Sequence, residues 1–409
     1  MAHSTTHAAT AQTIRALRGV PWAFKRLAER LLNISHGSLS LTLPNGEVLV
    51  FRGCNKGPKA AIHIHNYALV GRVARTGDVG LAESYIAGEW STPDLARALT
   101  TISLNIDRMH SLATGGSRIM RLVYSALLRL NANTRQGAKR NISVHYDLGN
   151  AFYEYWLDPS MTYSSARYDG QDLMLEEAQR RKYSAMAKNL DLKPDDHVLE
   201  IGCGWGGFAD YAAREVGARV TGITISREQF DYASARIQKA QLNEKVDLQL
   251  IDYRDVRGRF DKVASIEMFE AVGQKYWPSY FAKISSVLKP AGRAAVQIIT
   301  IRDDIFSRYA KRMDFIQRYI FPGGVLPSVE VLHNEFEDAG LKLEDAQMFG
   351  QDYARTLAEW HRNFMVVWKH IAPMGFDLRF YRLWRFYLAY CEAGFATGRT
   401  DVGQFVLSK

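Results

Sequence analysis

The sequence is poor in cysteine and has no long apolar run. Its 409 residues include three cysteines, Cys54, Cys203 and Cys391. These are too few and too scattered for a disulfide framework or a zinc site, so we expect no metal centre. No apolar stretch approaches the roughly 20 residues that a membrane-spanning helix needs. The beginning of the chain, MAHSTTHAAT, lacks the basic and then apolar layout of a signal peptide. We therefore expect a cytoplasmic protein.

Acidic residues are scarce in the N-terminal third. Residues 1–140 contain 18 Lys and Arg against 7 Asp and Glu, whereas the rest of the chain contains 34 against 36. A basic surface favours a polyanionic partner, either nucleic acid or anionic lipid. Residues 12–33 and 117–140 have the pattern of basic amphipathic helices, the first interrupted at Pro21, and this pattern favours a membrane surface. Helices that pack between domains are the alternative.

The order of the patterns predicts two domains. Residues 37–53 alternate apolar and polar positions around Pro-Asn-Gly, which is typical of a β-hairpin. With the helical patterns around it, this hairpin predicts a small α+β domain at 1–115, which we expect to bind lipid or a membrane. Residues 116–140 are expected to be a basic linker, and residues 141–409 to form the second domain.

The second domain has the pattern of an α/β protein. From Asp196 onwards short apolar runs alternate with helical patterns, which predicts a doubly wound parallel sheet. A final antiparallel pair is expected at 341–349 and 402–409. Helical inserts are expected at 302–335 and 353–397, the second of which is rich in Trp, Tyr and Phe.

The stretch VLEIGCGWGGF (198–208) places four glycines between an apolar run and a predicted helix. Glycine lets the backbone approach a ligand without a clash at Cβ, and a strand, glycine loop and helix form the usual site for a nucleotide-like ligand. The spacing E-x-G-x-G-x-G-G differs from the G-x-G-x-x-G of dinucleotide enzymes and is similar to the loop that methyltransferases use for S-adenosylmethionine. A turn that serves only tight packing is the alternative.

Two further absences narrow the range of possible substrates. The segment 218–230 has no acidic residue at the end of its strand, where class I methyltransferases usually bind the ribose. The segment SIEMFEAVG (265–273) lacks the Asn/Asp-Pro-Pro-Tyr sequence common in enzymes that methylate nucleic-acid bases, so we expect no nucleic-acid partner. It offers a carboxylate, Glu270, instead. Aromatic residues gather at 145–168, 316–328 and 351–360, and an aromatic, water-poor pocket suits an apolar substrate and can stabilise a carbocation.

Seven motifs occur in an order that resembles the cyclopropane-fatty-acyl-phospholipid synthase family. They are HYDLGNAFYEYWLD, MTYSSA, EIGCGWGG, GITISREQ, MFEAVG, DFIQRYIFPGG and LPS. The resemblance runs from about Asn141 to the C-terminus, and GSLSLTLPNG and AESYIAGEW resemble the smaller domain of that family. The chain is also similar to the mycolic acid cyclopropane synthases.

The resemblance implies a fold, a cofactor and a reaction. The fold is that of a class I methyltransferase, with a Rossmann-like seven-stranded sheet and helical inserts behind a small N-terminal α+β domain. The enzyme would transfer the methyl group of S-adenosylmethionine to a cis double bond of a phospholipid acyl chain, and the carbocation would lose a proton to close a cyclopropane ring. The residues implied to bind the cofactor are Tyr163, Ser164, Gly202, Gly204, Gly206, Thr224, Ile225, Gln229, Asp252, Tyr253 and Ile266.

The family pattern also implies a bicarbonate ion as the base, held by a cysteine, a glutamate, a histidine and a tyrosine. Glu270 and Tyr353 match this pattern, but Ser165 stands at the cysteine position and Gln297 at the histidine position. Both can hydrogen-bond an anion, although neither adds positive charge. The alternative outcome is therefore a methyl-branched product or, by proton loss from a neighbouring chain carbon, a methylated and shifted alkene.

The implied partner is a phospholipid bilayer with unsaturated acyl chains, preferably an anionic one, with the protein bound peripherally to the inner face of the membrane. Two other functions compete with this interpretation: a nucleic-acid methyltransferase and a catalytically inactive lipid-binding protein. Whether the chain forms a homodimer is left open.

Overall fold

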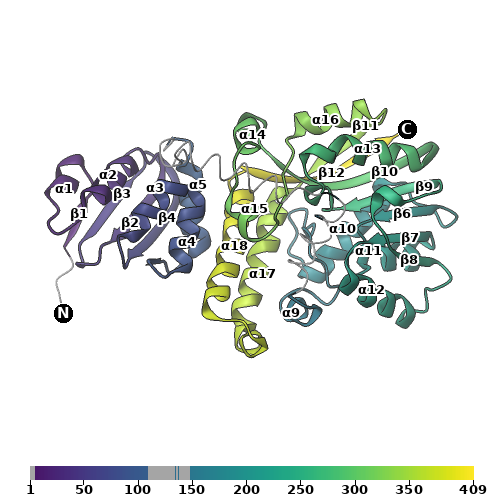
Figure 1. The fold of residues 1–409 in the computed structure, drawn as a ribbon, viewed down its shortest axis with the longest axis horizontal. Helices are drawn as coiled ribbons and strands as arrows, with labels where there is room; N and C mark the ends of the chain where they lie inside the picture. Colours follow the sequence, from purple (N-terminus) through teal and green to yellow (C-terminus); the bar gives the residue numbers. More distant parts are fainter. Residues whose placement is uncertain (1–4, 109–133, 135–136, 138–147) are drawn as a thin grey trace.

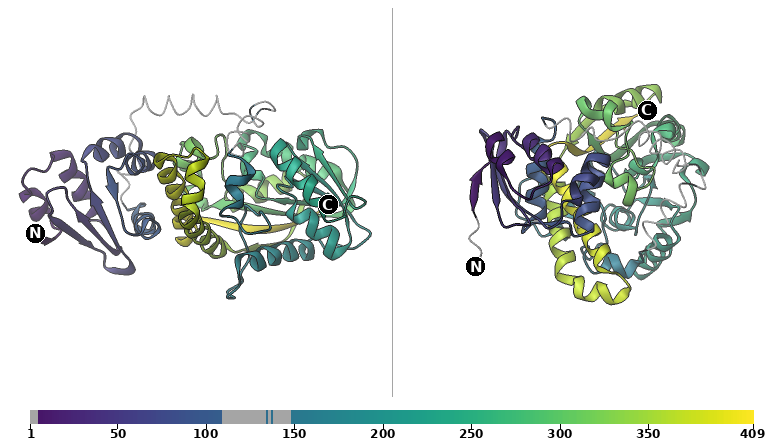
Figure 2. Two further views of the ribbon diagram at one scale, coloured as in Figure 1. Left: turned by 90° about the horizontal axis from the view of Figure 1, so that it is seen from below. Right: turned by 60° about the vertical axis from the view of Figure 1, so that its left-hand side comes forward.

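The computed structural model describes residues 5–108, 134, 137 and 148–409, and it contains two β-sheets in two domains. The N-terminal domain is drawn in purple and blue in Figure 1, and a hairpin of two long helices separates it from the larger sheet. The views in Figure 2 have the same arrangement. Most of the basic segment expected at 117–140, and the domain boundaries expected at 115 and 141, lie outside the described residues.

The N-terminal sheet has five strands in the order β1-β3-β2-β4-β5. The expected hairpin is present, because β2 pairs antiparallel with β3 and places Leu39 opposite Phe51. The predicted first helix is indeed divided at Pro21, which precedes α2. The elements are β1 (Thr6–Ala8), α1 (Ala11–Ala16), α2 (Trp22–Leu31), β2 (His36–Thr42), β3 (Val48–Arg52), β4 (Asn55–Ile64), α3 (Ala68–Thr76), α4 (Asp78–Ile86), β5 (Trp90–Ser91) and α5 (Leu95–Asn105).

The larger sheet has seven strands in the order β11-β12-β10-β9-β6-β7-β8. Strands β6 to β10 pair parallel with one another, while β12 is antiparallel to both β10 and β11, as the sequence predicted. The strands are β6 (His197–Ile201), β7 (Arg219–Thr224), β8 (Val246–Leu250), β9 (Phe260–Ile266), β10 (Leu288–Ile301), β11 (Lys342–Met348) and β12 (Thr400–Ser408). The predicted class I methyltransferase architecture is confirmed.

Helices cover this sheet and form the two inserts. The main ones are α9 (Asn150–Glu154), α10 (Leu175–Asn189), α11 (Gly207–Tyr211), α12 (Arg227–Lys239), α13 (Trp277–Val287), α14 (Asp303–Tyr309), α15 (Phe315–Tyr319), α16 (Val329–Asp338), α17 (Gly350–Ile371) and α18 (Leu378–Ala396). The second insert is the α17–α18 hairpin. No helix among the described residues is both long and apolar enough to span a bilayer.

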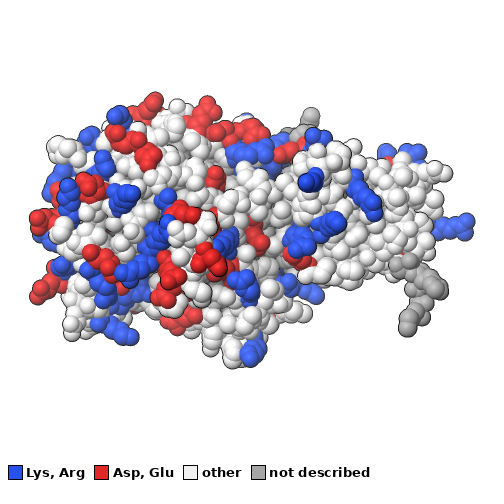
Figure 3. Space-filling view, turned by 180° about the vertical axis from the view of Figure 1, so that it is seen from behind, with Lys and Arg blue, Asp and Glu red and all other residues white. Residues whose placement is uncertain are grey.

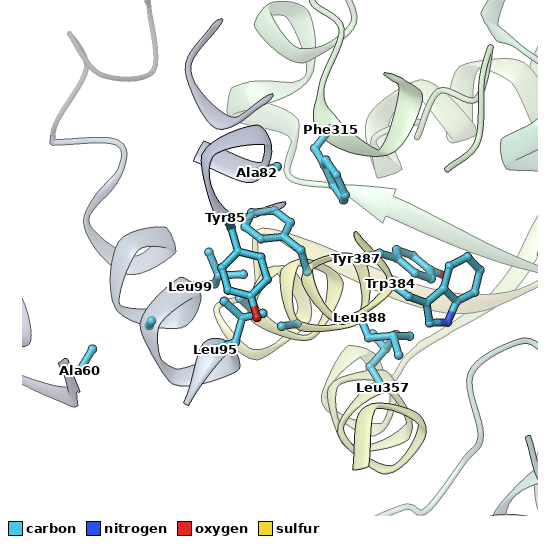
Figure 4. Close-up of a cluster of buried hydrophobic side chains, with 14 of the residues drawn as sticks. Ala60, Ala82, Tyr85, Leu95, Leu99, Phe315, Leu357, Trp384, Tyr387 and Leu388 are labelled. Atoms are coloured by element: carbon cyan, nitrogen blue, oxygen red, sulfur yellow. The ribbon is translucent and has the colours of Figure 1, made fainter. Parts of the chain in front are cut away.

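The two domains share an apolar interface. Figure 4 shows Tyr85 of α4 and Leu99 of α5 close to α18. The ring of Tyr85 lies 5.7 Å from that of Phe386, and Phe386 lies 4.9 Å from Phe315 of the first insert. At the edge of this interface Asp107 accepts hydrogen bonds from Arg399 at 3.1 and 3.2 Å. Both helical inserts therefore connect the larger sheet to the N-terminal domain.

Candidate active site

The glycine loop follows β6 at the carboxyl edge of the parallel strands. Gly202, Gly204 and Gly206 all have positive φ angles, of 83°, 52° and 83°. A Cβ atom on Gly204 would meet no heavy atom within 4 Å, and this residue lines a large cavity. Gly206 differs, because its Cβ would lie 3.1 Å from Ala233 of α12 and it does not line the cavity. Gly206 thus supports helix packing, and we do not assign it a contact with the cofactor.

The other residues predicted to bind the cofactor gather around this loop. They come from the segment before α10, from the ends of β7, β8 and β9 and from the beginning of α12. The carboxyl ends of parallel strands meet at one edge of the sheet. All of them line the same cavity: Tyr163, Ser164, Thr224, Ile225, Gln229, Asp252, Tyr253 and Ile266. Ser226 caps α12 by accepting the Gln229 N–H at 3.3 Å, and the Thr224 hydroxyl donates to Gln229 Oε1 at 3.0 Å.

Three of the four predicted catalytic residues meet at a carboxylate that the sequence analysis did not select, Glu267. The Ser165 backbone N–H and the Gln297 amide donate to its Oε1 atom at 2.8 and 2.7 Å. The Tyr353 hydroxyl donates to Oε2 at 2.7 Å. The Ser165 hydroxyl, which was expected to face an anion, donates instead to the Ala166 carbonyl at 2.9 Å. Ser165 therefore acts through its backbone.

A second layer of polar groups fixes the orientation of Gln297. Gln404 of β12 donates from Nε2 to Gln297 Oε1 at 3.1 Å, and Asn189 of α10 donates to Gln404 Oε1 at 2.8 Å. Because Gln297 Oε1 is used as an acceptor, its amide nitrogen is directed at Glu267. Gln404 and Gln297 are almost fully buried, so this chain of amides is shielded from solvent.

Glu270, the fourth predicted catalytic residue, lies in a different environment. Its Oε1 atom accepts the Ile299 N–H at 2.5 Å, while Oε2 has no hydrogen-bond partner among the described residues. Burial and, to a smaller extent, the Glu267 carboxylate raise the pKa of Glu270 to about 8. Burial also raises the pKa of Glu267, but its three donors and the charge of Lys182 oppose that rise. Since like charges resist joint ionisation, each of these two carboxylates opposes the ionisation of the other.

A basic residue, Lys182, lies beside this site, where Ser165 and Gln297 carry no charge. It lies fully buried in α10, and its Nζ donates to Ser164 Oγ at 2.7 Å and to Gln179 Oε1 at 2.8 Å. Burial lowers its pKa to about 7, and the neighbouring carboxylates, Glu267 first among them, raise it. Burial raises the pKa of Glu200, another of these neighbours, to about 8.

Aromatic side chains form a wall of the cavity, as the sequence predicted. The Tyr163 and Tyr387 hydroxyls lie 2.6 Å apart, and the Tyr163 ring lies 5.2 Å from that of Trp360. The Tyr353 ring stacks on Phe395 with a centroid distance of 4.4 Å. Ring faces of this kind attract positive charge.

Comparison with known proteins identifies the family. A family model described as mycolic acid cyclopropane synthetase matches residues 133–405. The tuberculostearic acid methyltransferase of Mycobacterium tuberculosis is 37% identical over 392 residues, covering 93% of this chain and 90% of that protein. The cyclopropane-fatty-acyl-phospholipid synthase of Escherichia coli K12 is 34% identical over 360 residues, covering 87% of this chain and 89% of that protein. This chain belongs to the mycolic acid cyclopropane synthetase family.

A solved structure in the same family agrees with this result. A mycolic acid cyclopropane synthase crystallised with SAH and CTAB aligns with a TM-score of 0.63 and 28% identity, covering 66% of this chain and 98% of that one. The protein is therefore an S-adenosylmethionine-dependent lipid methyltransferase, and the predicted family, enzyme class and cofactor are confirmed.

The described residues fit this cofactor. The open space beside Gly204 gives the ligand access to the backbone. Two buried carboxylate oxygens, Glu200 Oε2 and Glu270 Oε2, have no hydrogen-bond partner among the described residues, and both side chains line the cavity. Unpaired acceptors suit a ligand that carries a sulfonium and an ammonium group.

Glu267, Lys182 and Gln404 were not predicted from the sequence, for different reasons. Glu267 lies in the quoted segment SIEMFEAVG, three residues before Glu270, and nothing local distinguishes the two. Lys182 had a usable signal, because it follows Leu175 and Ala178 on the buried face of α10 at helical spacing. Gln404 lies in the last strand and gave no signal of a role.

We predict that Gly204→Val weakens S-adenosylmethionine binding by about tenfold or more, equivalent to about 1.4 kcal/mol, since the branched side chain would project into the cavity. Isothermal titration calorimetry measures this. Gly340→Val is the control, because Gly340 also has a positive φ angle and open surroundings but lies outside the cavity. Both variants carry similar backbone strain, so only Gly204→Val should lose affinity. Native affinity in a folded Gly204→Val protein would refute this placement of the cofactor.

Proposed function

We propose that the protein transfers the methyl group of S-adenosylmethionine to a cis double bond in an acyl chain of a membrane phospholipid and closes a cyclopropane ring. The proposal goes beyond the family assignment in naming the phospholipid, the double bond and the product. The observation that carries it is the cavity itself, which joins the glycine loop to the apolar interior of the N-terminal domain.

This cavity has a volume of about 930 Å³ and is lined by both domains. In the N-terminal domain its walls are mainly apolar side chains from the sheet and from the helices that cover it. They include Phe24, Leu27, Leu31, Leu39, Leu41, Ile62, Ile64, Leu69, Val73 and Leu99. In the other domain its walls include Gly204, Glu267 and Tyr163. An apolar chain lying in this space would bring its middle near the cofactor loop while the rest stays out of water.

The reaction follows from this environment. The alkene π-electrons attack the methyl carbon of the sulfonium, a C–C bond forms as the C–S bond breaks, and the positive charge moves to the chain. The rings of Tyr163 and Tyr353 and the nearby carboxylates stabilise that charge where water is excluded. Loss of a proton from the new methyl group then closes the ring. All atoms and charges balance with one proton released.

A methylated alkene is the second candidate product. The same cation gives it when the proton leaves a chain carbon next to the charge. The tuberculostearic acid methyltransferase favours this candidate, because it is 37% identical over 93% of this chain and is named for methyl transfer rather than for cyclopropane formation. A saturated methyl branch would also need a hydride donor, so we do not assign that product to this chain alone.

Helix α2 supports binding to an anionic bilayer. One side of it, with Phe24, Leu27 and Leu31, lines the cavity. On the other side Trp22 is 72% exposed, and the Arg26 guanidinium lies 5.3 Å from its ring centroid. An exposed tryptophan among basic residues is typical of helices that lie on a membrane surface. In Figure 3 the N-terminal domain, at the right, displays Lys and Arg with few acidic neighbours, whereas the larger domain displays both.

We predict that cells expressing the protein accumulate phospholipids whose unsaturated acyl chains have gained one CH2 unit. Mass spectrometry detects the gain, and proton NMR of the same lipids distinguishes ring protons from alkene protons. Ring signals support cyclopropane formation, and retained alkene signals with the same mass gain support the methylated alkene. Unchanged phospholipids beside an active, cofactor-consuming enzyme would reject a phospholipid substrate.

Leu27→Trp should raise the KM for lipid at least several-fold, because the larger side chain fills part of the cavity in the N-terminal domain. Its affinity for S-adenosylmethionine should stay native, since the cofactor loop is in the other domain. Val366→Trp is the control, because Val366 is 70% exposed on α17. A native KM in a folded Leu27→Trp enzyme would exclude this part of the cavity as the site of the acyl chain.

Exchanging Trp22 and Arg26 for alanine should weaken binding to anionic vesicles, because each basic residue near such a surface contributes about 1 kcal/mol and the indole anchors the interface. Vesicle sedimentation at increasing salt measures the effect. Lys239→Ala, an exposed change at the end of α12, should leave binding unchanged. Equal native binding to neutral and anionic vesicles at every salt concentration would contradict this surface.

A further inference from the structure

The donors expected to hold a bicarbonate ion are already bound to Glu267. The Ser165 N–H and the Tyr353 hydroxyl each have one proton to donate, and both are directed at this carboxylate. The Gln297 amide nitrogen is directed there as well. A separate bicarbonate would have to take these donors away and lie beside the charge of Glu267, and like charges at such distance repel.

The backbone at Glu267 is also unusual. Its φ angle is +49°, in the left-handed region that residues other than glycine rarely adopt. Such a conformation costs on the order of 1–2 kcal/mol, and it persists where surrounding contacts hold it in place, often at functional sites. Here it follows directly after β9, at the strand edge where the cofactor loop lies, and the side chain lines the cavity.

We propose that the carboxylate of Glu267 is the base that takes the proton from the methylated carbocation, so that this enzyme needs no bicarbonate. The inference rests on the proposed methyl transfer to a double bond. The electron pair of the broken C–H bond forms the new C–C bond of the ring, or the C=C bond of the methylated alkene. The proton moves to an oxygen of Glu267, and the resulting carboxylic acid gives it to solvent after the product leaves.

The surroundings of Glu267 suit this role. Its donors fix both oxygens, and it lies in an apolar cavity where a carboxylate is poorly solvated and therefore more basic. The three donors and the neighbouring Lys182 lower the pKa of Glu267 and so oppose the effect of burial on it. Acid should therefore inactivate the enzyme, because protonation of Glu267 removes the acceptor.

The experiment compares wild-type, Glu267→Gln and Glu267→Ala enzymes on unsaturated phospholipid vesicles, in buffer freed of bicarbonate and in buffer supplied with it. Glutamine keeps Oε1 as acceptor for Ser165 and Gln297, and its amide can donate to the Tyr353 oxygen, so this variant should fold and bind the cofactor. We expect its kcat to fall by about 10²- to 10⁴-fold, the usual contribution of a general base. Glu335→Gln in α16, outside the cavity, is the matched control and should keep native turnover.

Three outcomes support the assignment of Glu267 to the base. Wild-type turnover should not change when bicarbonate is removed, Glu267→Gln should lose kcat at native cofactor affinity, and added formate or bicarbonate should restore part of the turnover of Glu267→Ala but not increase that of the wild type. A purely structural role would not give such rescue.

Two outcomes would overturn it: a wild-type enzyme that slows when bicarbonate is removed, or a Glu267→Gln enzyme with near-native kcat. In either case methylated phospholipid made by the wild type would leave the proposed function intact. A wild type that adds no CH2 unit to phospholipid would instead refute the proposed function.

Discussion

An ionised carboxylate at the wall of an apolar cavity is costly, and the architecture around Glu267 is arranged to offset that cost. The desolvation penalty of a buried ion is several kcal/mol, whereas a hydrogen bond to a charged group contributes about 1.5–3 kcal/mol. The donors come from the segment before α10, from β10 and from α17, and Lys182 of α10 adds the opposite charge. These donors and Lys182 come together only when the sheet and its second insert are folded.

The helical inserts connect the Glu267 site to the N-terminal domain, where we propose that the acyl chain binds. Helix α17 carries Tyr353 at its beginning, and α18 packs against the N-terminal domain through Phe386, which is fully buried and contacts Tyr85. The same hairpin thus contributes a hydrogen bond to Glu267, part of the aromatic wall and the contact between domains. In our proposal the N-terminal domain has a matching role, because α2 lines the cavity on one side and faces the membrane on the other.

Much of this fold could be predicted from the sequence because the signals were local. The apolar runs predicted the strands, Pro21 divided the first helix, and the glycine spacing indicated the cofactor loop. The residues of the site were harder to predict. Gly206 belongs to the glycine pattern but packs against Ala233, a contact between distant residues that no motif records.

The selection of Glu270 over Glu267 shows the same limit. Both glutamates follow β9, and they differ in their hydrogen-bond donors, which lie about 30 to 100 residues away along the chain. Ser165 and Gln297 stand where the family pattern has a cysteine and a histidine. The sequence therefore did not show which residues would hold a bicarbonate base. In the structure these substitutions fit a site that holds a glutamate of the chain itself.

The most direct measurement is a crystal structure with S-adenosylhomocysteine and an unsaturated phospholipid, grown in the presence of bicarbonate. We predict that Glu267 keeps its contacts with Ser165, Gln297 and Tyr353, and that the acyl chain extends from the glycine loop into the N-terminal domain. A bicarbonate ion bound to the Ser165 N–H and the Tyr353 hydroxyl, with the Glu267 side chain turned away, would contradict this.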